Sequence, residues 1–126
     1  MATLKSFEEL DCYKACREFR NLMAEFCENL PSREEFRMKN QLLRAARSVT
    51  ANIAEGFGRH HHRENLQFCR LARGSLMECL DHLNTAQDEG FLSRESYEAF
   101  RSRHEVAAKL LNGYIGYLSR AAEASK

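Results

Sequence analysis

The stretch that decides the fold is QLLRAARSVTANIAEGFGR, residues 41–59. Its apolar residues recur three or four positions apart, at Leu42, Ala46, Val49 and Ile53. That spacing gathers them on one face of an α-helix, because the helix turns once every 3.6 residues. The stretch therefore predicts an amphipathic helix that buries one face in a core.

The same spacing recurs in three other segments, residues 12–30, 69–83 and 100–118. Pro31 ends the first of these helices, because its ring excludes a hydrogen bond to the carbonyl four residues back. Gly90 is the expected end of the third, because glycine readily takes the left-handed conformation that closes a helix. The last helix is expected to run for about thirty residues, or ~45 Å.

Two serines are expected to cap helices. Ser32 begins a capping box whose partner is Glu35, so the second helix is expected to begin there. Ser93 is expected to cap the fourth helix. Glycines stand on both sides of Phe57, which leaves open whether Phe57 belongs to the second helix or to the joint after it.

Four amphipathic helices with short connections predict an all-α fold, an antiparallel up-down four-helix bundle. We expect one domain over residues 1–126. Strand-forming residues are scarce, with two valines and two isoleucines in the chain. A coiled-coil rod is the alternative, although the glycine and proline joints would interrupt a long heptad pattern.

Composition favours a cytoplasmic protein without a metal or cofactor. No apolar run approaches the ~20 residues of a membrane span, and residues 1–10 lack the apolar stretch of a signal peptide. The five cysteines are odd in number and lie in the apolar stripes, so we expect free thiols that pack as small hydrophobes. No Cys-x-x-Cys pair is present to suggest zinc.

The net charge of +1 conceals a strong asymmetry along the chain. Residues 37–73 carry eight Lys/Arg against two Asp/Glu, whereas residues 1–36 and 74–126 are both net acidic. A basic face can lie along a phosphate backbone. The sequence therefore predicts a nucleic-acid-binding surface composed of five arginines: Arg44, Arg47, Arg59, Arg63 and Arg70.

An equally weighted interpretation is structural: the same arginines pair with the acidic first and fourth helices. Aromatic residues hardly interleave with the basic ones along this stretch, where Phe57 and Phe68 stand alone, so stacking on unpaired bases is not expected. The loop His60-His61-His62 is a weak candidate for a metal site, and an exposed polar loop is the favoured interpretation.

No residue pattern indicates catalysis. His104 lies on the fourth apolar stripe, as expected of a hydrogen-bonded core histidine. Ser48, Asn52 and Glu55 form a polar edge beside the second stripe, where Asn52 and Glu55 are expected to be buried and to fix helix register. A convincing nucleophile–base pair and a phosphate-binding loop are both absent, so we expect a protein that is not an enzyme.

The second helix resembles the signature of one family, the four-helix-bundle proteins encoded in intervening sequences of bacterial large-subunit ribosomal RNA. Residues 41–59 follow its pattern Gln-x-x-Arg-Ala-x-x-Ser-Ile-x-x-Asn-Ile-Ala-Glu-Gly, and residues 72–78 are similar to its Ala-Arg-Gly-Ser-Leu-x-Glu. Thr50 stands where many members have proline. The motif residues expected to be structural are Gln41, Ser48, Asn52, Glu55 and Gly56.

The resemblance implies a bundle that assembles as a ring-shaped homo-oligomer, a pentamer. A related branch is the accessory protein of diversity-generating retroelements, which partners a reverse transcriptase and binds RNA and DNA. The first hypothesis is therefore a nucleic-acid-binding accessory module. The second is a structural or protein-interaction ring without nucleic-acid affinity.

Overall fold

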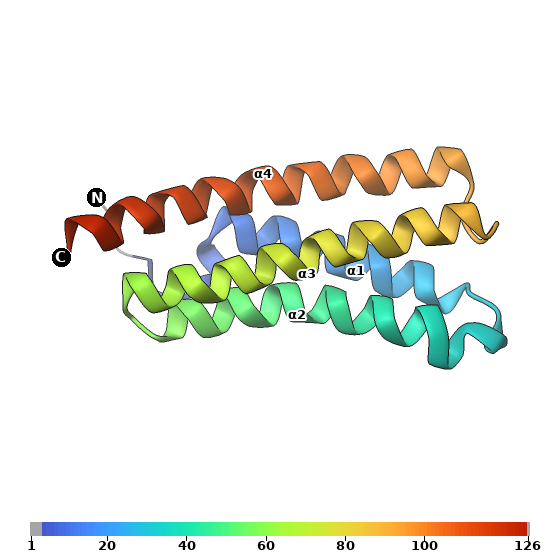
Figure 1. Cartoon of the computed structure of the whole chain (residues 1–126), viewed down its shortest axis with the longest axis horizontal. Coiled ribbons are helices and arrows are strands. Elements are labelled where there is room, and N and C mark those ends of the chain that lie inside the picture. Colours follow the sequence, from blue (N-terminus) through green and yellow to red (C-terminus); the bar gives the residue numbers. More distant parts are fainter. Residues whose placement is uncertain (1–3, 126) are drawn as a thin grey trace.

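The computed structural model describes residues 4–125, apart from the side chains of Glu35 and Phe36. Four helices dominate it: α1 (Asp11–Glu28), α2 (Asn40–Gly58), α3 (His62–Asp88) and α4 (Arg94–Ala124) (Figure 1). Three short helical segments complete it: η1 (Phe7–Glu9), η2 (Ser32–Glu34) and η3 (Glu35–Lys39). Residues 4–125 contain no strand, which confirms the all-α class.

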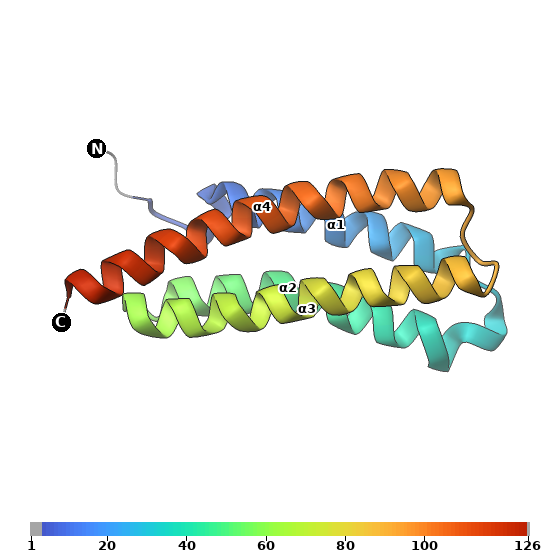
Figure 2. The same ribbon diagram turned by 45° about the horizontal axis from the view of Figure 1, so that its top comes forward.

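The helices form two layers, with α1 and α4 in one and α2 and α3 in the other (Figure 2). The α1–α2 and α3–α4 joints lie at one end of the molecule (Figure 1). The α2–α3 joint and the end of α4 lie at the other. Each helix packs against both of its neighbours, so the four apolar faces meet in a common core.

The core consists of the residues that the apolar spacing predicts. Leu42, Val49 and Ile53 of α2 are at most 1% exposed. Burying a side chain of this size stabilises the fold by about 1.5–3 kcal/mol. All five cysteines are buried free thiols, as expected. Burial raises the pKa of Cys16 to about 12, so this thiol stays protonated and packs as a small apolar group.

The expected start of the second helix at Ser32 is wrong. Ser32–Glu34 form a 3-10 turn and the chain kinks at Arg37, whose φ of −112° and ψ of −105° are not helical. Regular helix begins only at Asn40. Glu34 is buried and accepts a hydrogen bond from Arg37 at 3.2 Å, and this contact lies where the segment leaves helical geometry.

The other helix ends agree with those predicted from the sequence. Gly90 has φ of +82°, the left-handed conformation expected after α3. The Ser93 hydroxyl accepts a hydrogen bond from the backbone N–H of Ser96 at 3.1 Å and so caps α4, which has 31 residues. Phe57 lies inside α2 rather than in the joint.

Candidate nucleic-acid interface

All five arginines of the predicted surface are exposed. Arg44 and Arg47 project from the outer face of α2, opposite its buried stripe. Arg70 lies on the outer face of α3, and Arg59 and Arg63 flank the α2–α3 joint. Within residues 4–125, Arg44, Arg47, Arg63 and Arg70 form no ion pair and no side-chain hydrogen bond.

Arg59 differs from the other four. Its guanidinium lies 3.4 Å from a carboxylate oxygen of Glu55, one helical turn earlier. It also lies over the ring of Phe68, 5.0 Å from the ring centroid. Both contacts hold Arg59 against the α2–α3 joint, so less of its charge is available to a partner.

The structure spreads these arginines along the bundle rather than gathering them. Fifteen residues separate Arg44 from Arg59, about 22 Å of helix at 1.5 Å per residue. Arg44 and Arg47 lie in the first half of α2, nearer the α1–α2 joint, whereas Arg59 and Arg63 flank the α2–α3 joint at its other end. An extended polymer can span both groups, whereas a small anion cannot.

The polar residues of the motif join α2 to α3. The Ser48 and Ser75 hydroxyls are hydrogen-bonded at 2.9 Å. The Asn52 side-chain amide donates to the Ser48 carbonyl at 2.9 Å and to the Ser48 hydroxyl at 3.0 Å. We call Ser48, Asn52 and Ser75 the polar seam, and all three are half-buried.

The other motif residues divide between packing and solvent. Gly56 is buried where α3 comes closest: a Cβ atom there would lie 2.7 Å from the Asn65 side-chain oxygen and 2.8 Å from the Phe68 Cβ. Gln41 is exposed. The expected burial of Glu55 is wrong, because its side chain is 54% exposed and pairs with Arg59 along the helix surface. Glu55 lies farther round the helix than Asn52, away from α3.

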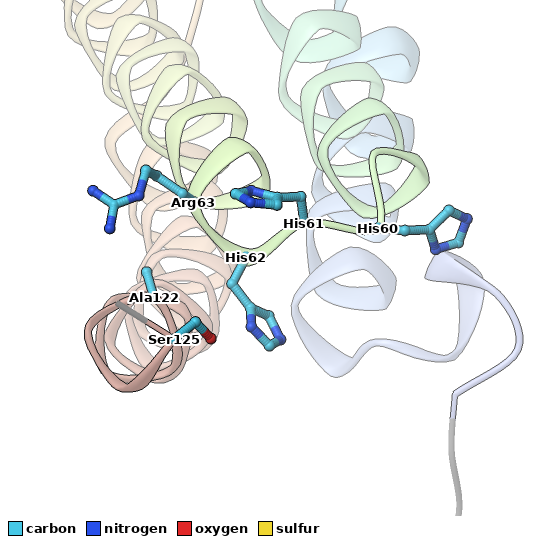
Figure 3. Close-up of a pocket in the computed structure, with 6 residues that line it drawn as sticks. All are labelled: His60, His61, His62, Arg63, Ala122 and Ser125. Carbon is cyan, nitrogen blue, oxygen red and sulfur yellow. The ribbon is translucent and has the colours of Figure 1, made fainter.

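The histidine joint is exposed, as the favoured interpretation expected. His60, with φ of +54°, turns the chain between α2 and α3. The rings of His60, His61 and His62 point apart (Figure 3). No group of three potential ligands in the described part of the chain is placed to hold a metal ion. The three histidines and Arg63 line an open pocket of about 180 Å³. Its other side is lined by Ala122 of α4 and by Ser125, which follows that helix.

A stacked pair of aromatic side chains on α4 contacts His62 at this basic joint, which the sequence did not predict. Tyr117 of α4 is 51% exposed and stacks on Tyr114, with ring centroids 6.1 Å apart and an interplanar angle of 17°. The His62 and Tyr117 rings form a T-shaped contact, with their centroids 6.1 Å apart and an interplanar angle of 84°. These residues are far apart in sequence, so inspection of residues 37–73 could not detect the cluster.

His104 is the core histidine that the sequence indicates. It is 3% exposed, and its Nε2 lies 2.7 Å from the Leu76 carbonyl oxygen. Because a carbonyl only accepts, Nε2 carries the hydrogen. Burial lowers the pKa of His104, so the ring is held neutral.

No helix within residues 4–125 is both long and apolar enough to cross a membrane. The fold and the polar seam define a four-helix bundle whose α2–α3 pair carries a sequence motif and an exposed basic surface.

The chain belongs to the 23S rRNA-intervening sequence protein family, whose model matches residues 8–113. Its fold is similar to that of a solved protein of unknown function from the S23 ribosomal protein family of Bacteroides thetaiotaomicron. The TM-score is 0.77 at 23% identity, over 83% of this chain and 95% of that one. No curated protein matches the sequence.

Proposed function

We propose that this protein is a non-enzymatic, antiparallel up-down four-helix bundle that assembles as a ring-shaped homopentamer and binds nucleic acid. The binding surface comprises Arg44, Arg47, Arg59, Arg63 and Arg70. A structured RNA is the proposed ligand, and a reverse transcriptase is the candidate protein partner.

One observation carries the proposal: four of the five arginines have no internal partner. Salt bridges to the acidic first and fourth helices would have neutralised these arginines. Within residues 4–125, no such salt bridge is formed by Arg44, Arg47, Arg63 or Arg70. The ion pair of Arg59 is with its own helix. Exposed guanidinium groups of this kind bind phosphate oxygens.

Binding through such a surface is largely independent of base sequence, because phosphate contacts position a nucleic acid without reading it. Its strength falls steeply with salt, because each phosphate neutralised releases condensed counterions. A ring of five chains would repeat the basic surface around one axis and so present it to a long polymer.

A second candidate is a protein-interaction ring without nucleic-acid affinity. Large apolar side chains are exposed on α3 and α4, including Leu71 at 59%, Met77 at 55% and Val106 at 49%. Side chains of this kind support contacts with other subunits or proteins. They fit the oligomer in both candidates, so nucleic-acid binding is what separates them.

The deciding experiment is an anisotropy titration with a structured RNA at ~50 mM and ~300 mM salt. We expect binding at low salt that weakens by more than tenfold at high salt. Charge reversal of Arg44→Glu together with Arg47→Glu should abolish it. The matched control is Arg17→Glu with Arg94→Glu, two exposed arginines without ion pairs in the described chain, which changes net charge equally.

Failure of the oligomeric wild type to bind at low salt would refute nucleic-acid binding and leave the interaction ring. Equal loss of binding in both charge-reversed proteins would show that only overall charge matters. Binding that survives in the Arg44/Arg47 variant would place the site at Arg59 and Arg63 instead.

A further inference from the structure

The end of the bundle at the α2–α3 joint combines an exposed aromatic ring with cationic groups. Tyr117 is 51% exposed, and its ring stacks on that of Tyr114. His62 borders the ring at 6.1 Å. His62 also lines the pocket of about 180 Å³, together with His60, His61 and Arg63, and Ala122 and Ser125 at the end of α4 line its other side (Figure 3).

A buried residue of α3 holds the Tyr114–Tyr117 pair in place. Tyr114 is half-buried, and its hydroxyl accepts a hydrogen bond from the Asn65 side-chain amide at 2.9 Å. Burial raises the pKa of Tyr114 to about 12, so the phenol stays neutral. Asn65 is itself 7% exposed and lies against Gly56, which ties the pair to the packed α2–α3 contact.

A planar ring beside a cation is the arrangement that binds one nucleotide. An unpaired base stacks on an aromatic face, and a guanidinium holds the adjoining phosphate. A base inside a duplex has both faces covered by its neighbours and cannot stack in this way. The chemistry of this end therefore selects single-stranded segments over paired ones.

Resting on the proposed nucleic-acid-binding function, we propose that the Tyr117–Arg63 end of the bundle binds an unpaired nucleotide of single-stranded RNA. The base stacks on the Tyr117 ring beside His62, and the neighbouring phosphate lies against Arg63. The outer-face arginines Arg44 and Arg47 then hold the remaining backbone. The substrate class becomes RNA with a loop, bulge or free end.

Acidic groups at this end limit how much charge it offers. Glu64 lies 3.9 Å from His61, and Glu55 pairs with Arg59. Arg63 has no ion pair within residues 4–125 and is thus the cation left for a phosphate. A single cation and a single ring make a one-nucleotide site rather than a long groove.

The test compares two probes with the full-length protein. One is a single-stranded oligoribonucleotide carrying a 2-aminopurine, whose fluorescence is quenched on stacking, and the other is the same strand annealed to its complement. We expect tighter binding of the single strand and quenching only with it. Tyr117→Leu should weaken single-strand binding about tenfold, since stacking one base is worth roughly 1–3 kcal/mol.

The matched control is Tyr117→Phe, which keeps the ring and should retain both affinity and quenching. Duplex binding should be unchanged in both variants. If Tyr117→Leu alters the circular dichroism spectrum, Tyr117→Gln serves as the second variant, with loss of single-strand preference expected because the ring is again removed.

Equal affinity for both probes, with no effect of Tyr117→Leu, would refute the stacking site but not the proposed basic surface. Failure of the wild type to bind either probe at low salt would remove the proposed function itself, and the stacking site with it.

Discussion

The Ser48 hydroxyl accepts a hydrogen bond from Asn52 and is joined to the Ser75 hydroxyl at 2.9 Å, across the α2–α3 interface. The polar seam links α2 to α3 through the Ser48–Ser75 hydrogen bond and so opposes sliding of the two helices along each other. These residues lie inside the family motif, so part of that motif forms a contact between α2 and α3.

Asn52→Ala should destabilise the protein by about 1–3 kcal/mol, because it leaves the Ser48 groups without their donor in a half-buried interface. Thermal unfolding followed by circular dichroism measures the effect as a lower Tm. Gln41→Ala is the control in the same helix, since Gln41 is exposed and makes no side-chain hydrogen bond within residues 4–125. An unchanged Tm for Asn52→Ala would move the residue from the interface to a surface role.

Gly56→Ala should destabilise by about 1–3 kcal/mol, because the added methyl group overpacks the contact with Asn65 and Phe68. The comparison is Gly74→Ala in the interior of α3, where a Cβ meets nothing within 4 Å. That change should stabilise by up to ~1 kcal/mol, since alanine favours the helix. Urea unfolding of the two variants should show shifts of opposite sign. Shifts of the same sign would contradict the packing argument.

His104 should make the protein less stable in mild acid. Burial lowers its pKa in the folded state, so the unfolded chain binds the proton more readily. The stability is therefore present above the ordinary histidine pKa of about 6.5 and falls as the pH drops below that value. Arg101 acts in the same direction as burial, while Glu105 and the Leu76 carbonyl oppose it.

Urea unfolding between about pH 7.5 and pH 5 tests this dependence. His104→Phe should be less stable at neutral pH because it loses the bond to Leu76, but its stability should change less over this range. The exposed histidines are common to both proteins and cancel in the comparison. Parallel pH profiles would show that His104 does not contribute to the dependence.

The oligomer is tested by light scattering at micromolar concentration. A chain of 14.6 kDa that forms a pentamer should give about five times that mass. Exposed apolar residues on α3 and α4 provide candidate contacts, so Val106→Glu should shift the mass downward. A monomer for the wild type would remove the ring, although it would not affect the proposed RNA contacts of a single chain.

Local periodicity was sufficient to predict the core and most helix ends. Leu42, Val49 and Ile53 are buried because residues three and four apart share a face whatever the partner helix is. The start of α2 could not be read in this way. It depends on burial of Glu34 and on the kink at Arg37, and neither is a property of the local pattern.

The candidate site was predictable only in part. The arginines could be found because they are concentrated in one segment of the chain. The contact of His62 with Tyr117 joins the start of α3 to the end of α4, which are far apart in sequence. It depends on the lengths of the two helices and on how each is rotated about its axis.

The salt dependence of binding should distinguish the individual arginines. For single-stranded RNA, each phosphate contact contributes about −0.7 to the slope of log affinity against log salt. Arg44→Ala and Arg47→Ala should each make the slope shallower by about that amount, because neither side chain has an ion pair or hydrogen bond within residues 4–125. Arg59→Ala should change the slope less, since Arg59 is held by Glu55 and Phe68.

Anisotropy titrations at four or more salt concentrations provide these slopes, and Arg17→Ala controls for loss of a charge on α1. The expected ranking is a larger change of slope for Arg44 and Arg47 than for Arg59. The reason is that the guanidinium groups of Arg44 and Arg47 are unpaired within residues 4–125, whereas that of Arg59 makes two contacts. A larger change for Arg59 than for Arg44 would mean that nucleic acid displaces Glu55. Binding would then centre on the α2–α3 joint rather than on the outer face of α2.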